Sequence, residues 1–183
     1  LNRPFDPIGL WQLLVKHNPA PYLSALYVPK DESELSEDVA ITSASPELFM
    51  KRDGNLKTSS PIKGTGKNSD DLLEKDRAEN IMIVDLIRND LSRVAIDGSV
   101  AVPELMRVEQ HPGLVHLVSD VTGLVSNNVS WHEILQAMSP PGSVSGAPKL
   151  SSLEVIAQLE PTERNIYCGA FGYVNSDLGT ATL

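Results

Sequence analysis

The stretch "DLLEKDRAENIMIVDLIRNDLSRV", residues 71–94, is the strongest helical pattern in the chain. Apolar residues recur in it at every third or fourth position, which predicts an amphipathic helix with one buried face. Asp71 and Glu74 have the spacing of a capping box, so we expect the helix to begin there. The predicted apolar stripe consists of Leu73, Ile81, Val84, Ile87, Leu91 and Val94.

Shorter patterns lie on both sides of this helix. The strand patterns are 22–28, 39–44, 113–125, a hairpin around Asp53-Gly54 and a last hairpin that turns at Asn175 to Gly179. The other helical patterns are 10–17, 131–138 with Ser130 as its N-cap, and 150–160. Strands and helices do not alternate regularly, which argues against a doubly wound parallel fold. We therefore expect an α+β fold in which antiparallel sheets pack together with helices on the outside.

Composition narrows the class of protein. Of the 183 residues, 41% are hydrophobic and 21% are charged, which is typical of a folded globular chain. The net charge of -9 argues against a nucleic-acid or anionic membrane surface, although focused lysines could still bind an anionic small molecule. The single cysteine, Cys168, excludes an intrachain disulfide. No stretch is apolar enough to span a membrane, so we expect a cytoplasmic protein.

The long helix carries four acids, Asp76, Glu79, Asp85 and Asp90. Helical spacing places Glu79 and Asp90 near one face, so one or two carboxylates could line a cleft. Mg²⁺ typically takes one or two protein carboxylates and completes its shell with water or substrate oxygens. The alternative is a solvated helix face, which spacing alone favours.

The loop "PPGSVSGAPK" (140–149) runs into the helical pattern at 150–160. Gly142 and Gly146 leave its backbone open, and Pro148 fits the first turn of a helix whose free N–H groups could bind an anion. An ordinary loop explains the same residues equally well. A nucleotide-binding P-loop is excluded, because the glycine spacing before Lys67 is wrong and no Ser or Thr follows that lysine.

His116 lies in the valine-rich strand pattern, where a half-buried structural histidine is the usual explanation. The other histidines, His17, His111 and His132, have no spacing that suggests a zinc site. Lys63, in "SSPIKGTGK" (59–67), stands among Pro61, Ile62 and small residues. It is either a surface charge on a turn or a lysine held for chemistry.

Several motifs together resemble, in order along the chain, the C-terminal catalytic domain of the chorismate-utilising enzymes. That family includes the large subunits of anthranilate synthase and aminodeoxychorismate synthase, together with isochorismate and salicylate synthases. The resemblance covers nearly the whole chain, and its most specific parts are "DLIRNDLSRV" and "SGAPK". The motifs are "NPAPY" (18–22), "SASPELF" (43–49), "PIKGT" (61–65), "AENIMIVDLIRNDLSRV" (78–94), "VHLVSDV" (115–121), "GSVSGAPK" (142–149) and "YCGAFGYV" (167–174).

The resemblance implies roles for individual residues. Glu79 matches a glutamate that binds Mg²⁺, and His116 matches a histidine beside the substrate ring. Glu47 matches an acid implicated in proton transfer. The residues implied to contact chorismate are Thr65, Ser145, Gly146, Ala147 and Tyr167.

Lys63 selects a branch of the family. The "PIKGT" lysine resembles that of the aminodeoxychorismate synthases, where it acts as a nucleophile, whereas anthranilate synthases carry alanine there. Its attack needs a neutral amine, and partly apolar surroundings favour that form. The expected reaction converts chorismate and ammonia to 4-amino-4-deoxychorismate, for para-aminobenzoate and folate biosynthesis. Anthranilate synthase, isochorismate synthase and a non-catalytic binding module of the same fold stay open as alternatives.

The resemblance also implies a larger protein. Residues 1–183 are expected to be part of a single catalytic domain, cut at both ends and therefore inactive or barely active by themselves. An arginine that grips the substrate and a second metal-binding glutamate of the family have no counterpart in this sequence. The implied partner is a glutamine amidotransferase, as a subunit or a fused domain, which supplies ammonia.

Overall fold

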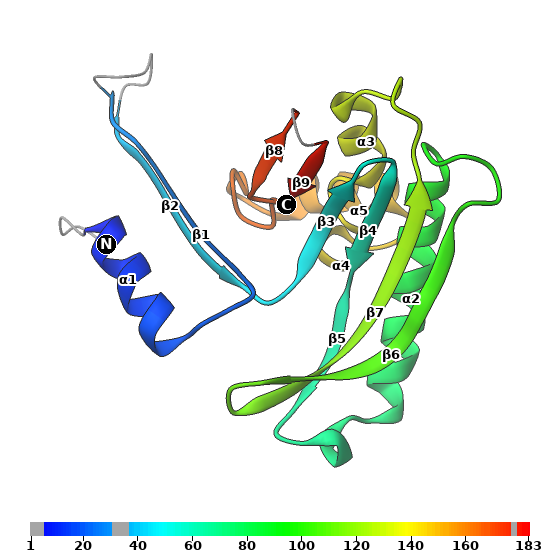
Figure 1. Ribbon diagram of the computed structural model, residues 1–183, viewed down its shortest axis with the longest axis horizontal. Coiled ribbons are helices and arrows are strands. Elements are labelled where there is room, and N and C mark those ends of the chain that lie inside the picture. Colours follow the sequence, from blue (N-terminus) through cyan, green and yellow to red (C-terminus); the bar gives the residue numbers. More distant parts are fainter. Residues whose placement is uncertain (1–5, 31–36, 177–178) are drawn as a thin grey trace. The chain divides into compact units, whose positions relative to one another are not determined.

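The computed structural model describes residues 6–30, 37–176 and 179–183, which form two compact units divided after Leu48. The first unit holds helix α1 (Pro7–His17) and the strands β1 (Tyr22–Val28) and β2 (Val39–Ser45), drawn in blue in Figure 1. The two strands pair antiparallel, from Tyr22 opposite Ser45 to Val28 opposite Val39. Helix α1 begins three residues before the predicted start, because the Asp6 carboxylate accepts the Ile8 N–H and Pro7 occupies the first turn.

The second unit is built on a mixed arrangement of helices and one antiparallel sheet. Its strands are β3 (Leu48–Asp53), β4 (Leu56–Ser60), β5 (Ile62–Gly66), β6 (Ala101–His111), β7 (Leu114–Leu124), β8 (Tyr173–Asn175) and β9 (Thr180–Thr182). Its helices are the 3₁₀ turn η2 (Ser69–Asp71), α2 (Glu74–Ser92), α3 (Trp131–Met138), α4 (Gly142–Ser145) and α5 (Lys149–Leu159). The strand order is β5-β7-β4-β3-β9-β8, with β6 also paired to β7. This architecture confirms the predicted α+β fold.

Strand β7 is the centre of the sheet. Its C-terminal half pairs with β4 and its N-terminal half pairs with β5, while β6 pairs along its length. Pro61 separates β4 from β5, since proline has no N–H for the ladder, and its carbonyl accepts the Ser119 N–H at 3.2 Å. Lys63 therefore lies on a strand and not on a turn.

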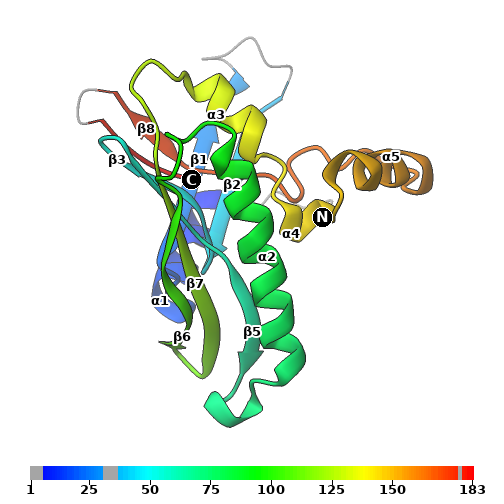
Figure 2. The ribbon, with the colours of Figure 1, turned by 90° about the vertical axis from the view of Figure 1, so that its right-hand side faces the viewer.

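Helix α2 lies along this sheet, as Figures 1 and 2 show. It begins at Glu74, and the predicted capping box of Asp71 and Glu74 is wrong. The Asp71 carboxylate instead accepts the N–H groups of Lys67 (2.8 Å) and Asn68 (3.2 Å), which stabilises η2. Asp76 accepts the Leu73 N–H at 2.8 Å and so stabilises the first turn of α2.

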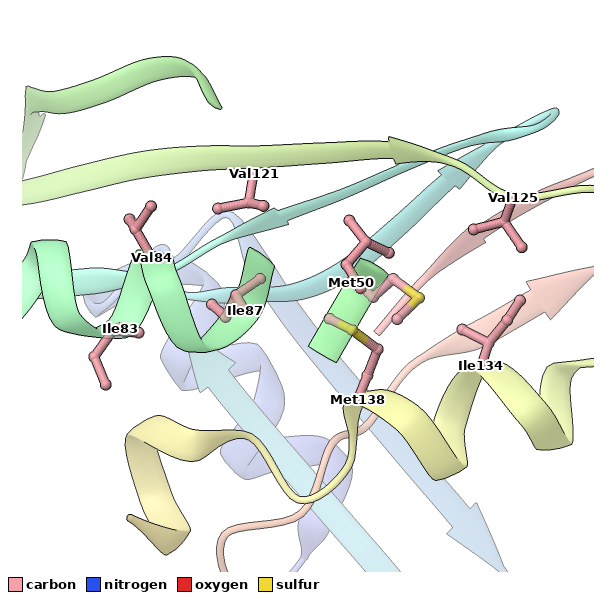
Figure 3. Packing of buried hydrophobic residues seen from close by; sticks show 9 residues of the cluster. Met50, Ile83, Val84, Ile87, Val121, Val125, Ile134 and Met138 are labelled. Carbon is pink, nitrogen blue, oxygen red and sulfur yellow. The ribbon is translucent and has the colours of Figure 1, made fainter. Parts of the chain in front are cut away.

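The buried face of α2 differs from the predicted stripe. Ile81 is 46% exposed and Leu73 precedes the helix, whereas Ile83 and the polar Asn80 are buried. The main core consists of Met50, Ile83, Val84, Ile87, Leu91, Val121, Val125, Ile134 and Met138, which Figure 3 shows between α2, α3 and the sheet. The core thus fixes α2 and α3 on the same side of the central strands.

The remaining elements confirm some predictions and correct others. Ser130 caps α3 as predicted, with a reciprocal bond from Glu133. The loop at 140–149 contains the single turn α4, and Pro148 stands before α5 and not inside its first turn. Strands β8 and β9 form the predicted hairpin, but only from Tyr173. In the part of the chain that the structure describes, no helix is long and apolar enough to cross a membrane.

Candidate active site

Lys63 lies at an irregularity of β5. The register against β7 shifts between Ile62 and Thr65, so Lys63 and Gly64 occupy a β-bulge, a feature that often redirects a side chain next to a functional site. Gly64 has a φ of +87°, and a Cβ on it would lie 2.8 Å from the Asp76 Cβ. Glycine at this position thus lets β5 approach α2 closely, with the half-buried Lys63 beside it.

His116 faces the end of the same bulge. It is paired with Thr65 in the ladder, and its Nδ1 lies 2.9 Å from the Thr65 Oγ1. The His116 side chain is largely buried, and burial lowers its pKa, with a smaller lowering by the charge of His111. A hydrogen bond to the Gly64 backbone and the charge of Glu109 act in the opposite direction. The net lowering keeps the imidazole neutral near pH 7. The structure thus brings Lys63, Thr65 and His116 together on adjacent strands.

The predicted anion loop lies against the C-terminal half of α2, beside an open cleft of about 800 Å³ that Leu86, Asp90, Gly146 and Ala147 help to line. The N–H groups of Ser145 and Gly146 are already bonded to the carbonyls of Pro141 and Gly142, at 3.1 Å and 2.9 Å. Within the described residues, the backbone donors left free at this place are the N–H groups of Ala147 and of the first turn of α5, and the side chains of Asn89, Arg93 and Gln136 line the same cleft. An anion would therefore meet Ala147 and α5 before it met Ser145.

Lys149, at the start of α5, forms an ion pair within the protein. Its Nζ lies 2.7 Å from the Asp90 Oδ2 and donates to the Ala137 carbonyl at 3.2 Å. Asp90 is consequently engaged as an ion-pair partner and is not a free metal-binding carboxylate. The sequence analysis did not predict this pair, because 59 positions separate its members and no local spacing links them.

Glu79 is exposed on α2. The described residues contain no group of three or more His, Cys, Asp or Glu side chains that could hold a metal ion. A single carboxylate does not hold Mg²⁺ by itself, since that ion needs about six oxygen ligands. Glu79 could supply one of these ligands, with water and substrate oxygens completing the shell.

The remaining two predicted residues are Tyr167 and Glu47. Tyr167 is 72% exposed, in the turns between α5 and β8. Glu47 belongs to the first unit, where its N–H donates to the Ser45 Oγ and its carbonyl accepts from that hydroxyl, both at 3.1 Å. The roles of Tyr167 in substrate contact and of Glu47 in proton transfer stay predictions.

Asn80 and Ser119 form a buried hydrogen-bond network next to the site, which was not predicted from the sequence. The Asn80 Oδ1 accepts a short hydrogen bond from the Ser119 Oγ, and the Asn80 Nδ2 donates to the Leu117 carbonyl at 3.3 Å. The Ser119 Oγ accepts the Met106 N–H at 2.9 Å. These bonds fasten α2 to β7 and β6 through Leu117 and Ser119, which follow His116 in β7. The sequence signal for this network was Asn80 itself, a polar residue four positions before Val84 and therefore on the buried face of the helix.

The sequence is similar to known proteins of one family. The sequence matches the family of chorismate binding enzymes over residues 1–183. It is 45% identical over 151 residues to aminodeoxychorismate synthase component 1 of Escherichia coli (strain K12), covering 76% of this chain and 33% of that protein. It is 39% identical over 183 residues to anthranilate synthase component 1 of Thermus thermophilus, covering 93% of this chain and 38% of that protein.

The fold has a solved counterpart as well. The crystal structure of anthranilate synthase component I from Streptococcus pneumoniae matches with a TM-score of 0.80 and 31% identity, over 98% of this chain and 40% of that one. The chain thus spans about a third of the length of the Escherichia coli relative and two fifths of the Streptococcus structure.

Proposed function

The chain belongs to the family of chorismate binding enzymes, and we propose that its full-length protein is component 1 of an aminodeoxychorismate synthase. In this proposal the protein converts chorismate and ammonia to 4-amino-4-deoxychorismate, a precursor of para-aminobenzoate and folate. The observation that carries the proposal is Lys63 on the bulged strand β5, next to the bonded pair of Thr65 and His116.

Lys63 is the proposed nucleophile. Its neutral Nζ attacks C2 of chorismate, the ring double bonds shift, and the hydroxyl at C4 leaves with a proton as water. Ammonia then bonds to C4, the double bonds shift back, and the amine of Lys63 departs unchanged after the proton transfers. In this proposal His116 accepts or returns a proton beside the ring, which its hydrogen bond to Thr65 and its lowered pKa support.

The remaining polar groups are proposed to bind substrate. A carboxylate of chorismate would take the free N–H groups at Ala147 and the first turn of α5, next to Ser145 and Gly146. Glu79 would supply one ligand to Mg²⁺, which offsets the charge of a substrate carboxylate when it is bound. Because the net charge of the chain is -9, such local donors are needed to attract an anion.

A glutamine amidotransferase, either a separate subunit or a fused domain, is the proposed source of ammonia. The relatives named component 1 support a second component in the assembly. Addition of free ammonium salt would replace that partner in a test of the present component.

Anthranilate synthase is the second candidate, and the 39% identical Thermus thermophilus relative favours it. Mass spectrometry of the products formed by the full-length protein from chorismate, ammonium and Mg²⁺ separates the candidates. We expect aminodeoxychorismate. Anthranilate or isochorismate as the product would contradict the proposal, and chorismate binding without turnover would favour a non-catalytic module.

A further inference from the structure

A second histidine lies against His116. The β6–β7 hairpin brings His111, at the end of β6, to the ring of His116, with ring centroids 4.8 Å apart and an interplanar angle of 66°. Such an edge-to-face contact restricts the rotation of both rings. No role was predicted for His111 from the sequence, where it had no metal-like spacing.

His111 is itself held by a chain of charges on β6 and β7. Its Nε2 lies 3.0 Å from the Glu109 Oε1, and the Glu109 Oε2 accepts from the Arg107 Nη2 at 3.1 Å. The Arg107 Nη1 in turn lies 2.8 Å from the Asp120 Oδ2. Glu109 is therefore held from one side by a permanent cation, and its other oxygen lies next to His111.

The other groups around His116 come from β5, α2 and β6. Strand β5 contributes the Thr65 hydroxyl and the Gly64 backbone, and it also carries Lys63. Helix α2, packed over β5, places the Asp76 Cβ against Gly64. The charges that shift the pKa of His116 are those of His111 and Glu109, both on β6.

We propose that His111, backed by Glu109, is a positioning residue for His116. The edge-to-face contact holds the His116 ring with Nδ1 toward Thr65, and the charge of His111, next to Glu109, disfavours a proton on His116. His111 has no contact with the reacting atoms in this scheme. Its effect on turnover rests on the proposed function, whereas its effect on the protonation of His116 does not.

The test is a titration of the full-length protein labelled with ¹³C at histidine Cε1, with the His116 signal assigned by its loss in His116→Gln. His111→Phe keeps an aromatic edge but removes the charge. We expect the titration midpoint of His116 to rise by about half a unit or more in this variant. Glu109→Gln should lower the titration midpoint of His116, because a carboxylate whose charge favours the imidazolium is lost. His132→Phe, on α3, is the matched control and should leave the His116 midpoint unchanged.

The acid limb of the pH profile of kcat/KM for chorismate should move upward with the His116 midpoint in His111→Phe, which is about a threefold loss of rate on that limb for half a unit. An unchanged His116 midpoint in either His111→Phe or Glu109→Gln overturns the inference. Absence of aminodeoxychorismate with both midpoint shifts present would instead contradict the proposed function alone.

Discussion

Lys149 and Asp90 form an ion pair, with 2.7 Å between Nζ and Oδ2, that ties the start of α5 to the C-terminal half of α2. The same Nζ donates to the Ala137 carbonyl in α3, so one side chain joins three helices. Both side chains are mostly buried, at 18% and 10% exposure. The position of the loop that ends in Ala147 therefore depends on a pair of charges at the wall of the open cleft, largely shielded from bulk water.

Disruption of the Lys149–Asp90 pair should cause a large loss of stability. Lys149→Met leaves the Asp90 carboxylate buried without its partner, and we expect the free energy of unfolding to fall by about 3 kcal/mol or more. The double variant Asp90→Leu/Lys149→Met should recover most of that loss, because no isolated charge remains. Urea denaturation measures both.

The matched control for this prediction is Arg88→Met. It breaks the exposed Arg88–Asp85 pair on the same helix, which has a similar length of 2.8 Å and should contribute less than about 1 kcal/mol. Equal losses for Lys149→Met and Arg88→Met would show that burial of the Lys149 pair has no energetic consequence.

A side chain at position 64 should destabilise the protein by pushing β5 away from α2. Gly64→Ala combines a φ of +87° with a Cβ only 2.8 Å from the Asp76 Cβ, so β5 must move away from α2. Gly54→Ala is the control, since Gly54 has a φ of +55° but no atom within 4 Å of the added Cβ. We expect Gly64→Ala to cost about 2 kcal/mol more in unfolding free energy than Gly54→Ala. Similar costs would contradict the close approach of β5 and α2.

Lys57 predicts a pH dependence of stability. Its side chain is 1% exposed, and its Nζ donates to the carbonyls of Gly54 (3.3 Å) and Asn55 (3.2 Å). Burial, helped by the charge of Arg52, lowers its pKa from 10.5 to about 8. Between these two values the unfolded chain binds more protons than the folded chain. The free energy of unfolding should therefore rise with pH from about 8 to 10.5, by up to about 3 kcal/mol.

The variant Lys57→Met removes the buried amine with little change in volume. We expect its free energy of unfolding at pH 7 to be about 1–3 kcal/mol higher than that of the unmodified protein. The rise of this free energy above pH 8 should disappear. Lys51→Met, at an exposed position on β3, should change neither property. Denaturation at pH 7 and at pH 9.5 decides the matter, and a destabilised Lys57→Met protein at pH 7 would refute the prediction.

The fold was predictable where a short local pattern was sufficient. The range 22–28 and the Ser130 cap came directly from sequence, because alternation and capping act over a few residues. Strand β6 was not predicted, since Pro103 and two register shifts against β7 interrupt its alternation. The start of α2 was misplaced because Asp71 has an alternative role in the short turn η2, which propensity does not reveal.

The candidate site was predictable only through motifs. The order of "PIKGT", "VHLVSDV" and "SGAPK" identified Lys63, His116 and the loop at 145–147, and the sheet register then paired Thr65 with His116. Contacts between distant segments, such as Lys149 with Asp90, have no local sequence signal. Charge partners of this kind decide which acids and bases stay free, so the chemical state of the site required the structure.

The most direct test of the central claim is a covalent adduct at Lys63. The full-length protein is incubated with chorismate in the absence of ammonia, and its peptides are mapped by mass spectrometry. The account predicts an addition on Lys63 with the mass of chorismate less one water, absent from Lys63→Ala and retained in the neighbouring control Lys67→Ala. Production of aminodeoxychorismate by Lys63→Ala at the rate of the unmodified protein would contradict it.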